Sequence, residues 1–209
     1  MLGYGQEPEP SATWNIAEEV THLLGRIDAQ GIERLHLVAH SLGSMFAMHL
    51  RLALGPRVTR MTLVDPVHMA VLREHGETDA AAEMEDQYKY FVRLLPDQDA
   101  AARAFTDHWN GAGAWDAVGE RARQKMAALV PRVLLEMNAT RTDHTPVAVL
   151  AANPPRTTIL VGERTKVAPP ATAKHLAKAF GADIILVPGA GHMIPLSHPA
   201  AICDAVTRP

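Results

Sequence analysis

The chain has 209 residues, enough to bury a core without disulfides or a structural metal, so we expect one medium-sized fold. Hydrophobic residues make up 47% of it, charged residues make up 21%, and the formal net charge is -3. This balance is typical of an ordinary globular chain and gives no electrostatic reason to expect nucleic acid as a partner. Small molecules are the expected partners.

Cysteine content and apolar runs bear on the compartment. The single cysteine, Cys203, excludes an internal disulfide. The first residues, MLGYGQEPEPSA, lack the apolar core of a signal peptide. No apolar run reaches the roughly 20 residues that cross a bilayer. We therefore expect a cytoplasmic protein without a membrane span.

Apolar patterning predicts helices that alternate with short strands. Residues 13–30 read as an amphipathic helix, because apolar side chains recur along one face and Gly31 supplies a stop. Nearly continuous apolar runs predict four parallel strands buried on both faces, at residues 34–39, 58–64, 157–161 and 184–187. The alternation indicates an α/β fold, with a parallel sheet of about four strands flanked by helices.

The long segment between the second and third predicted strands has a different pattern. It contains no strand candidate, and helices are expected at residues 79–95, 97–109 and 117–140. We expect a core made of residues 1–66 and 154–209, with residues 67–153 forming a helical insertion.

A serine stands where the strand at 34–39 must turn at once into a helix beginning near Leu42. The sequence there, AHSLG at positions 39–43, resembles the G-x-S-x-G nucleophile elbow of the α/β-hydrolase family, with Ala for the first Gly. The resemblance implies that Ser41 is the nucleophile and that the Leu42 N–H is an oxyanion donor. The alternative is a serine that only caps the helix, which would not explain the small flanking residues.

A serine hydroxyl needs a base to become a nucleophile. After the last predicted strand, PGAGHM at positions 188–193 resembles the Gly-His loop that carries the general base in this family, which implies His192. A histidine that merely packs in a loop is the alternative. No histidine spacing such as H-E-x-x-H argues for a metal, and no cofactor is expected.

The acid of the triad departs from the usual family pattern. Most members carry it in a G-x-x-D loop before the histidine strand, but here that loop is GERT, at positions 162–165, and ends in Thr165. Some α/β-hydrolases carry the acid at the end of the strand after the nucleophile helix, where this chain has Asp65. We favour Asp65 and expect it to contact His192. Glu163 is the rival, and a turn-opening role before Pro66 is the third interpretation of Asp65.

The helical insertion occupies the position of this family's lid. It carries Trp109 and Trp115, and the histidine loop adds Met193. These three side chains are expected to line a pocket for a small apolar acyl substrate, under helices that lie over the carboxyl ends of the strands.

The first residues resemble an internal part of the family fold. LGYG at positions 2–5 is similar to the glycine loop that follows the fourth strand, which implies an N-terminally shortened sheet without the loop that supplies the second oxyanion donor. Residues 35–39 should then form an open sheet edge capable of self-association. Two functions follow: a serine hydrolase of the esterase or lipase type, or a non-catalytic relative that binds an apolar ligand or partner.

Overall fold

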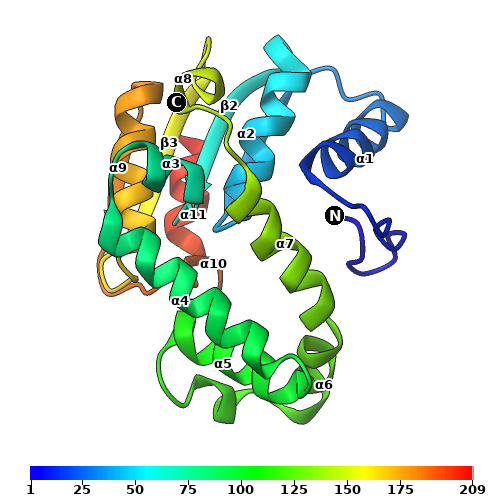
Figure 1. The fold of residues 1–209 in the computed structure, drawn as a ribbon. Coiled ribbons are helices and arrows are strands. Elements are labelled where there is room, and N and C mark those ends of the chain that lie inside the picture. The colour runs from blue at the N-terminus through cyan, green and yellow to red at the C-terminus, as the bar shows by residue number, and fades with distance from the viewer. Residues whose placement is uncertain (209) are drawn as a thin grey trace.

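Four parallel strands form one sheet in the computed structural model, which describes residues 1–208 (Figure 1). Their spatial order is β1-β2-β3-β4. The strands are β1 (Leu35–His40), β2 (Val58–Val64), β3 (Arg156–Gly162) and β4 (Asp183–Val187). Each lies within one residue of the predicted position, so the α/β fold with a four-stranded parallel sheet is confirmed.

Helices make up most of the rest of the chain. They are α1 (Ile16–Ala29), α2 (Gly43–Leu54), α3 (Met69–Glu74), α4 (Thr78–Leu94), α5 (Gln98–Asn110), α6 (Glu120–Ala128), α7 (Val130–Thr142), α8 (Val147–Leu150), α9 (Ala168–Phe180), α10 (Ile194–Ser197) and α11 (Pro199–Thr207). Short 3-10 turns lie at Gly55–Arg57 and Ala114–Ala117.

Two helix boundaries differ from the sequence-based prediction for local reasons. The first helix begins at Ile16 because the side chain of Asn15 accepts the Glu18 N–H and caps it. The stretch expected as a helix at 117–140 is instead two helices that meet at Leu129. Pro131 lies in the first turn of the second helix, where the missing N–H costs nothing.

The two faces of the sheet are covered by different helices. Alternate side chains of β2 and β3 point to opposite faces, as strand geometry requires. One face packs against α2, α8 and α9, with a core that includes Met48, Met61, Leu63, Leu150, Ile159, Val161, Leu176 and Phe180. The other packs against α10 and α11, with Val64, Leu160, Val187, Ile194 and Ala205.

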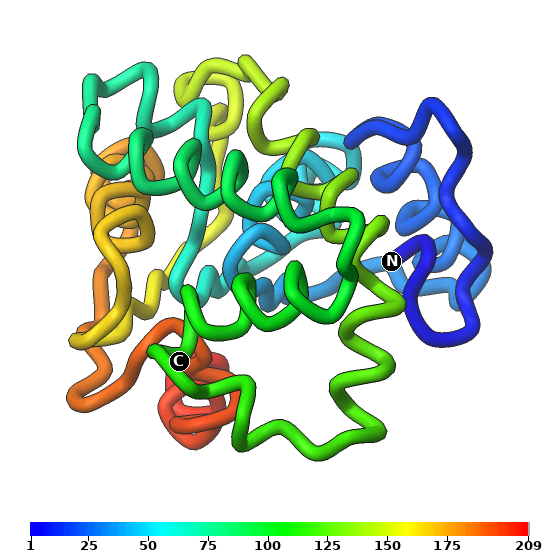
Figure 2. Tube along the Cα trace, turned by 60° about the horizontal axis from the view of Figure 1, so that its bottom comes forward, coloured from blue at the N-terminus to red at the C-terminus, as the bar shows by residue number. Residues whose placement is uncertain are grey.

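The segment between β2 and β3 contains only helices and turns, as predicted. Its helices α4 to α7 gather at one end of the sheet and cross in front of it when that end faces the viewer (Figures 1 and 2). Phe91 of α4 packs edge-on against Phe105 of α5, with ring centroids 6.0 Å apart. The division into a core and an inserted domain stays a prediction.

The expectation that all four strands are buried on both faces is wrong for the outer two. Among residues 1–208, β1 pairs only with β2 and β4 only with β3. Val38 of β1 is 48% exposed, and Ile184 and Leu186 of β4 are 46% and 56% exposed. Apolar runs therefore mark strands here but do not distinguish edge from centre. Within the same residues, no helix combines the length and the apolar character that a membrane crossing needs.

The open edge at β1 leads to a testable expectation about association. Unpaired strand edges recruit other strands, and a charge on the edge opposes this. The 209-residue protein should associate reversibly with rising concentration in sedimentation velocity, and Val38→Lys should shift it to the monomer. Leu196→Lys is the control, because Leu196 is 76% exposed but lies outside the sheet. A wild-type monomer at every concentration would contradict the prediction.

Candidate active site

Ser41 lies at the carboxyl end of β1, in the short turn that leads into α2. Its φ of 55° falls in the left-handed region that non-glycine residues rarely adopt. The Ser41 N–H donates to the carbonyl of Val64 at 2.9 Å, and its own carbonyl accepts the Ser44 N–H at 3.0 Å. These bonds hold the strained turn, and such strain is commonly found at functional sites.

His192 and Asp65 meet Ser41 at the same edge of the sheet. The Ser41 Oγ lies 2.8 Å from Nε2 of His192, and Nδ1 of His192 lies 2.5 Å from Oδ2 of Asp65. Both His192 and Asp65 are buried. The expected contact between Asp65 and His192 is present. With Nδ1–H donating to the carboxylate, Nε2 is free to accept the serine proton.

Asp65 is held by two further donors. Its Oδ1 accepts the Gly162 N–H at 3.0 Å, and its Oδ2 accepts the Thr165 hydroxyl at 2.5 Å. A buried carboxylate needs such donors to offset the loss of water. Thr165, which in the sequence stands where the family usually has a carboxylate, thus contacts Asp65, the candidate acid. The signal for this role was a hydroxyl residue at the position where the family usually has a carboxylate.

Glu163, the rival acid, makes a different contact. Its Oε2 accepts the Gly189 N–H at 2.7 Å, so it braces the loop that leads to His192. Gly162, just before it, approaches the same loop closely. A Cβ built there would lie 2.5 Å from the carbonyl oxygen of Gly191. The absence of a side chain at Gly162 is therefore what lets this loop reach the site.

Aromatic rings surround the imidazole of His192. The Trp109 ring stacks on it, with centroids 4.1 Å apart and planes 29° apart, and the His40 ring lies 4.9 Å away. Burial, together with the charges of Lys166 and His192, lowers the pKa of His108 to about 4. Burial and the neighbouring His192 also lower the pKa of His40. Both rings are neutral near pH 7, so neither opposes a positive charge on His192.

A cavity of about 550 Å³ opens beside Ser41 and His192. Its apolar wall comes from α2, α4, α5, α6, α7 and neighbouring loops, and consists of Met1, Leu42, Phe46, Val67, Met84, Phe105, Trp109, Met126, Val133, Met137 and Met193. The polar side includes Glu136, whose carboxylate accepts the Tyr4 hydroxyl at 3.1 Å. Burial raises the pKa of Glu136 to about 7.

The predicted pocket residues separate into two groups. Trp109 and Met193 line the cavity with Ser41. The placement of Trp115 there is corrected, because Trp115 does not line the cavity and is buried with Phe91, Ala127 and Val130 in a core between the helices. The 3-10 turn that carries Trp115 directs it into this core, which the periodicity of the sequence could not indicate.

The chain from residue 1 to residue 205 matches the family model described as "Alpha/beta hydrolase family". The protein is a member of the alpha/beta hydrolase family. This assignment agrees with the parallel sheet and with the position of Ser41 between a strand and a helix.

Two curated proteins are similar to this chain in sequence. An uncharacterized carboxylesterase, nap, of Bacillus subtilis is 24% identical over 201 residues, which covers 89% of this chain and 60% of that protein. Lipase LipV of Mycobacterium tuberculosis is 38% identical over 66 residues, which covers 32% of this chain and 25% of the lipase. The chain thus spans 60% or less of the length of these relatives.

A solved structure shows the same hydrolase fold. A hydrolase from Pseudomonas aeruginosa superposes with a TM-score of 0.72 at 20% identity, covering 98% of this chain and 75% of that one. At this identity the likeness demonstrates the fold alone.

Proposed function

We propose that the protein is a serine hydrolase that cleaves an ester or a related acyl substrate through an acyl-enzyme. The observation that carries this proposal is the unbroken series of hydrogen bonds from Asp65 through His192 to the Ser41 hydroxyl. A helix cap would require Ser41 only to satisfy backbone groups, whereas here its Oγ contacts a histidine that is itself oriented by a buried carboxylate.

In the proposed reaction, Ser41 Oγ attacks the carbonyl carbon while Nε2 of His192 takes its proton. Asp65 stabilises the imidazolium that forms. The Leu42 N–H is the proposed oxyanion donor, because Leu42 caps α2 and its N–H precedes the helical hydrogen-bond pattern. His192 then protonates the leaving group as its bond to the carbonyl carbon breaks. Water attacks the acyl-enzyme while His192 takes a proton from it, the bond to Ser41 Oγ breaks, and His192 returns that proton to Oγ.

We also propose that the helices between β2 and β3 form a lid. Residues of α4, α5 and α7 line the cavity beside Ser41, and Trp109 covers one face of the His192 ring. Such a cover would exclude water from the reacting groups. The apolar wall favours a small apolar acyl group. The two similar proteins are named as a carboxylesterase and a lipase, and both names denote enzymes that cleave carboxylic esters.

A fluorophosphonate probe tests the proposal, because it reacts covalently only with an activated serine. The protein should be labelled at Ser41, and Ser41→Ala should abolish the label. The exposed Ser11 gives a matched control, since Ser11→Ala should leave labelling unchanged. An unlabelled wild-type protein that binds apolar ligands in the cavity would instead support the second function considered from the sequence, a non-catalytic binding protein.

A further inference from the structure

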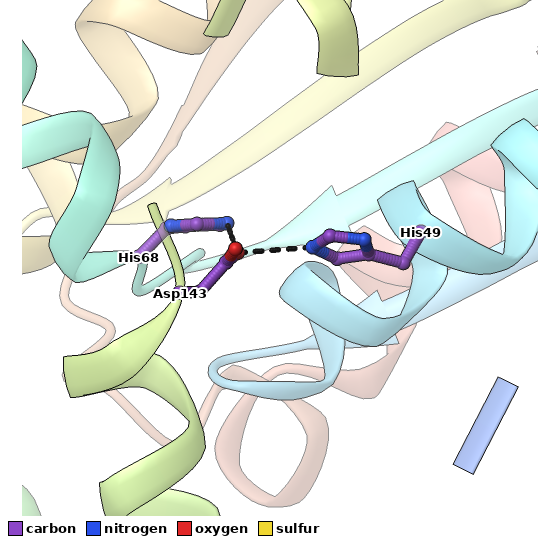
Figure 3. Close-up of side chains that lie close together, drawn as sticks. All are labelled: His49, His68 and Asp143. Carbon is purple, nitrogen blue, oxygen red and sulfur yellow. Dashed lines mark hydrogen bonds and ion pairs between the residues drawn. The ribbon is translucent and has the colours of Figure 1, made fainter. Parts of the chain in front are cut away.

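Outside the candidate active site, two histidines converge on one aspartate (Figure 3). His49 belongs to α2, His68 caps the start of α3, and Asp143 follows the end of α7. Nε2 of His49 lies 2.9 Å from Oδ2 of Asp143, and Nε2 of His68 lies 3.2 Å from the same oxygen. Three elements far apart in the sequence therefore present ligand atoms to one point.

The spacing of these atoms suits a small divalent ion. Ligand atoms of the three residues all lie within 4.8 Å of one another. Around a tetrahedral Zn²⁺ with bonds of about 2.0–2.2 Å, neighbouring ligand atoms are about 3.3 Å apart. The two nitrogen-to-oxygen distances are already close to that value. Two imidazoles and one carboxylate are also a ligand set that zinc uses in proteins.

A simple ion pair with Asp143 does not explain the burial of His68. Its side chain is fully buried, yet within residues 1–208 neither of its ring nitrogens makes a well-aligned hydrogen bond. Nε2 of His68 lies 3.2 Å from Asp143 but is poorly aligned for a hydrogen bond, and a metal ion would give this buried nitrogen a well-placed partner. His49, by contrast, keeps part of its surface exposed.

The carboxylate of Asp143 is oriented as a metal ligand would be. Its Oδ1 accepts both the N–H of Thr145, at 3.0 Å, and the Thr145 hydroxyl, at 2.6 Å. Oδ2 is left to face the two histidines. In known metal sites, hydrogen bonds of this kind hold the residues that bind the metal in their orientation. Asp143 also lines a cavity of about 300 Å³ beside α1 and α7.

We propose that His49, His68 and Asp143 bind a divalent transition metal of the zinc class, with water as the remaining ligand. The ion would join α2, the loop after β2 and the end of α7. His68 lies three residues after Asp65, so the same ion would anchor the loop that carries the proposed acid. The role is structural, because the site holds no residue of the Ser41 cavity.

Metal titration of chelator-treated protein, purified without a histidine tag, tests the proposal. Isothermal calorimetry with Zn²⁺ should show one ion per chain, and the thermal midpoint should rise when Zn²⁺ is added. Co²⁺ should give the intense visible absorption of a tetrahedral site. Asp143→Asn and His49→Gln should each weaken Zn²⁺ binding by about tenfold or more.

The control variant comes from another histidine-carboxylate pair. Nε2 of His22 lies 2.9 Å from Glu7, with no third ligand residue grouped there among residues 1–208, so His22→Gln should leave Zn²⁺ binding unchanged. If Asp143→Asn impairs folding because Asp143 is buried, His49→Gln still tests the site, since the His49 side chain is partly exposed. Wild-type protein that binds no Zn²⁺, or that binds it equally well after Asp143→Asn and His49→Gln, overturns the proposal.

Discussion

Asp65→Asn is expected to lower kcat on a simple acyl ester by about 10,000-fold, the size of the loss when the triad aspartate of a serine protease is changed in this way. The amide keeps the shape of the side chain but removes the charge. It also no longer selects the Nδ1–H form of His192, so Nε2 is less available as the base. Steady-state kinetics and circular dichroism on the same preparation measure the loss and check the fold.

Two neighbouring variants show whether the loss is specific to the acid. Glu163→Gln should change kcat by a few-fold at most, because Glu163 contacts the Gly189 N–H rather than His192. Thr165→Val should fall between them, at about tenfold, because it removes one hydrogen bond to the Asp65 carboxylate. A larger loss in Glu163→Gln than in Asp65→Asn would transfer the role of acid to Glu163.

Gly162→Ala should impair both stability and turnover. The new methyl group would lie 2.5 Å from the Gly191 carbonyl oxygen and 2.8 Å from that of Ala190, and backbone cannot rotate away as a side chain can. Overpacking of this kind costs about 1–3 kcal/mol. The displaced loop carries His192, and a shift of about 1 Å at reacting groups can reduce turnover about 100-fold. Thermal unfolding and kcat measure the two effects.

Gly191→Ala is the matched control, because a Cβ at that position meets nothing within 4 Å. It adds the same methyl group within the loop that Gly162 contacts, next to His192. Near-normal stability and turnover in Gly191→Ala, beside losses in Gly162→Ala, would show that the close approach matters rather than the loop's glycine content. Equal behaviour of the two variants would contradict the packing argument.

Local features of the sequence determined the elements of the fold and most of the candidate site. Continuous apolar runs located all four strands, because a strand that packs against helices needs apolar side chains whichever neighbours it has. AHSLG at 39–43 and PGAGHM at 188–193 indicated Ser41 and His192, because sharp turns demand small residues that leave a visible pattern. Asp65 was favoured by its place at a strand end.

Which side chains meet depends on how the elements pack in three dimensions. Asp65 and Glu163 both carry a carboxylate beside a strand end. The loop after β4 decides their contacts, because it brings His192 to Asp65 and the Gly189 N–H to Glu163. Trp109 and Trp115 lie six positions apart, yet one stacks on His192 and the other enters a separate core. The meeting of His49, His68 and Asp143 was likewise invisible in the sequence. Contacts between distant segments arise from the packing of whole elements, which no local pattern records.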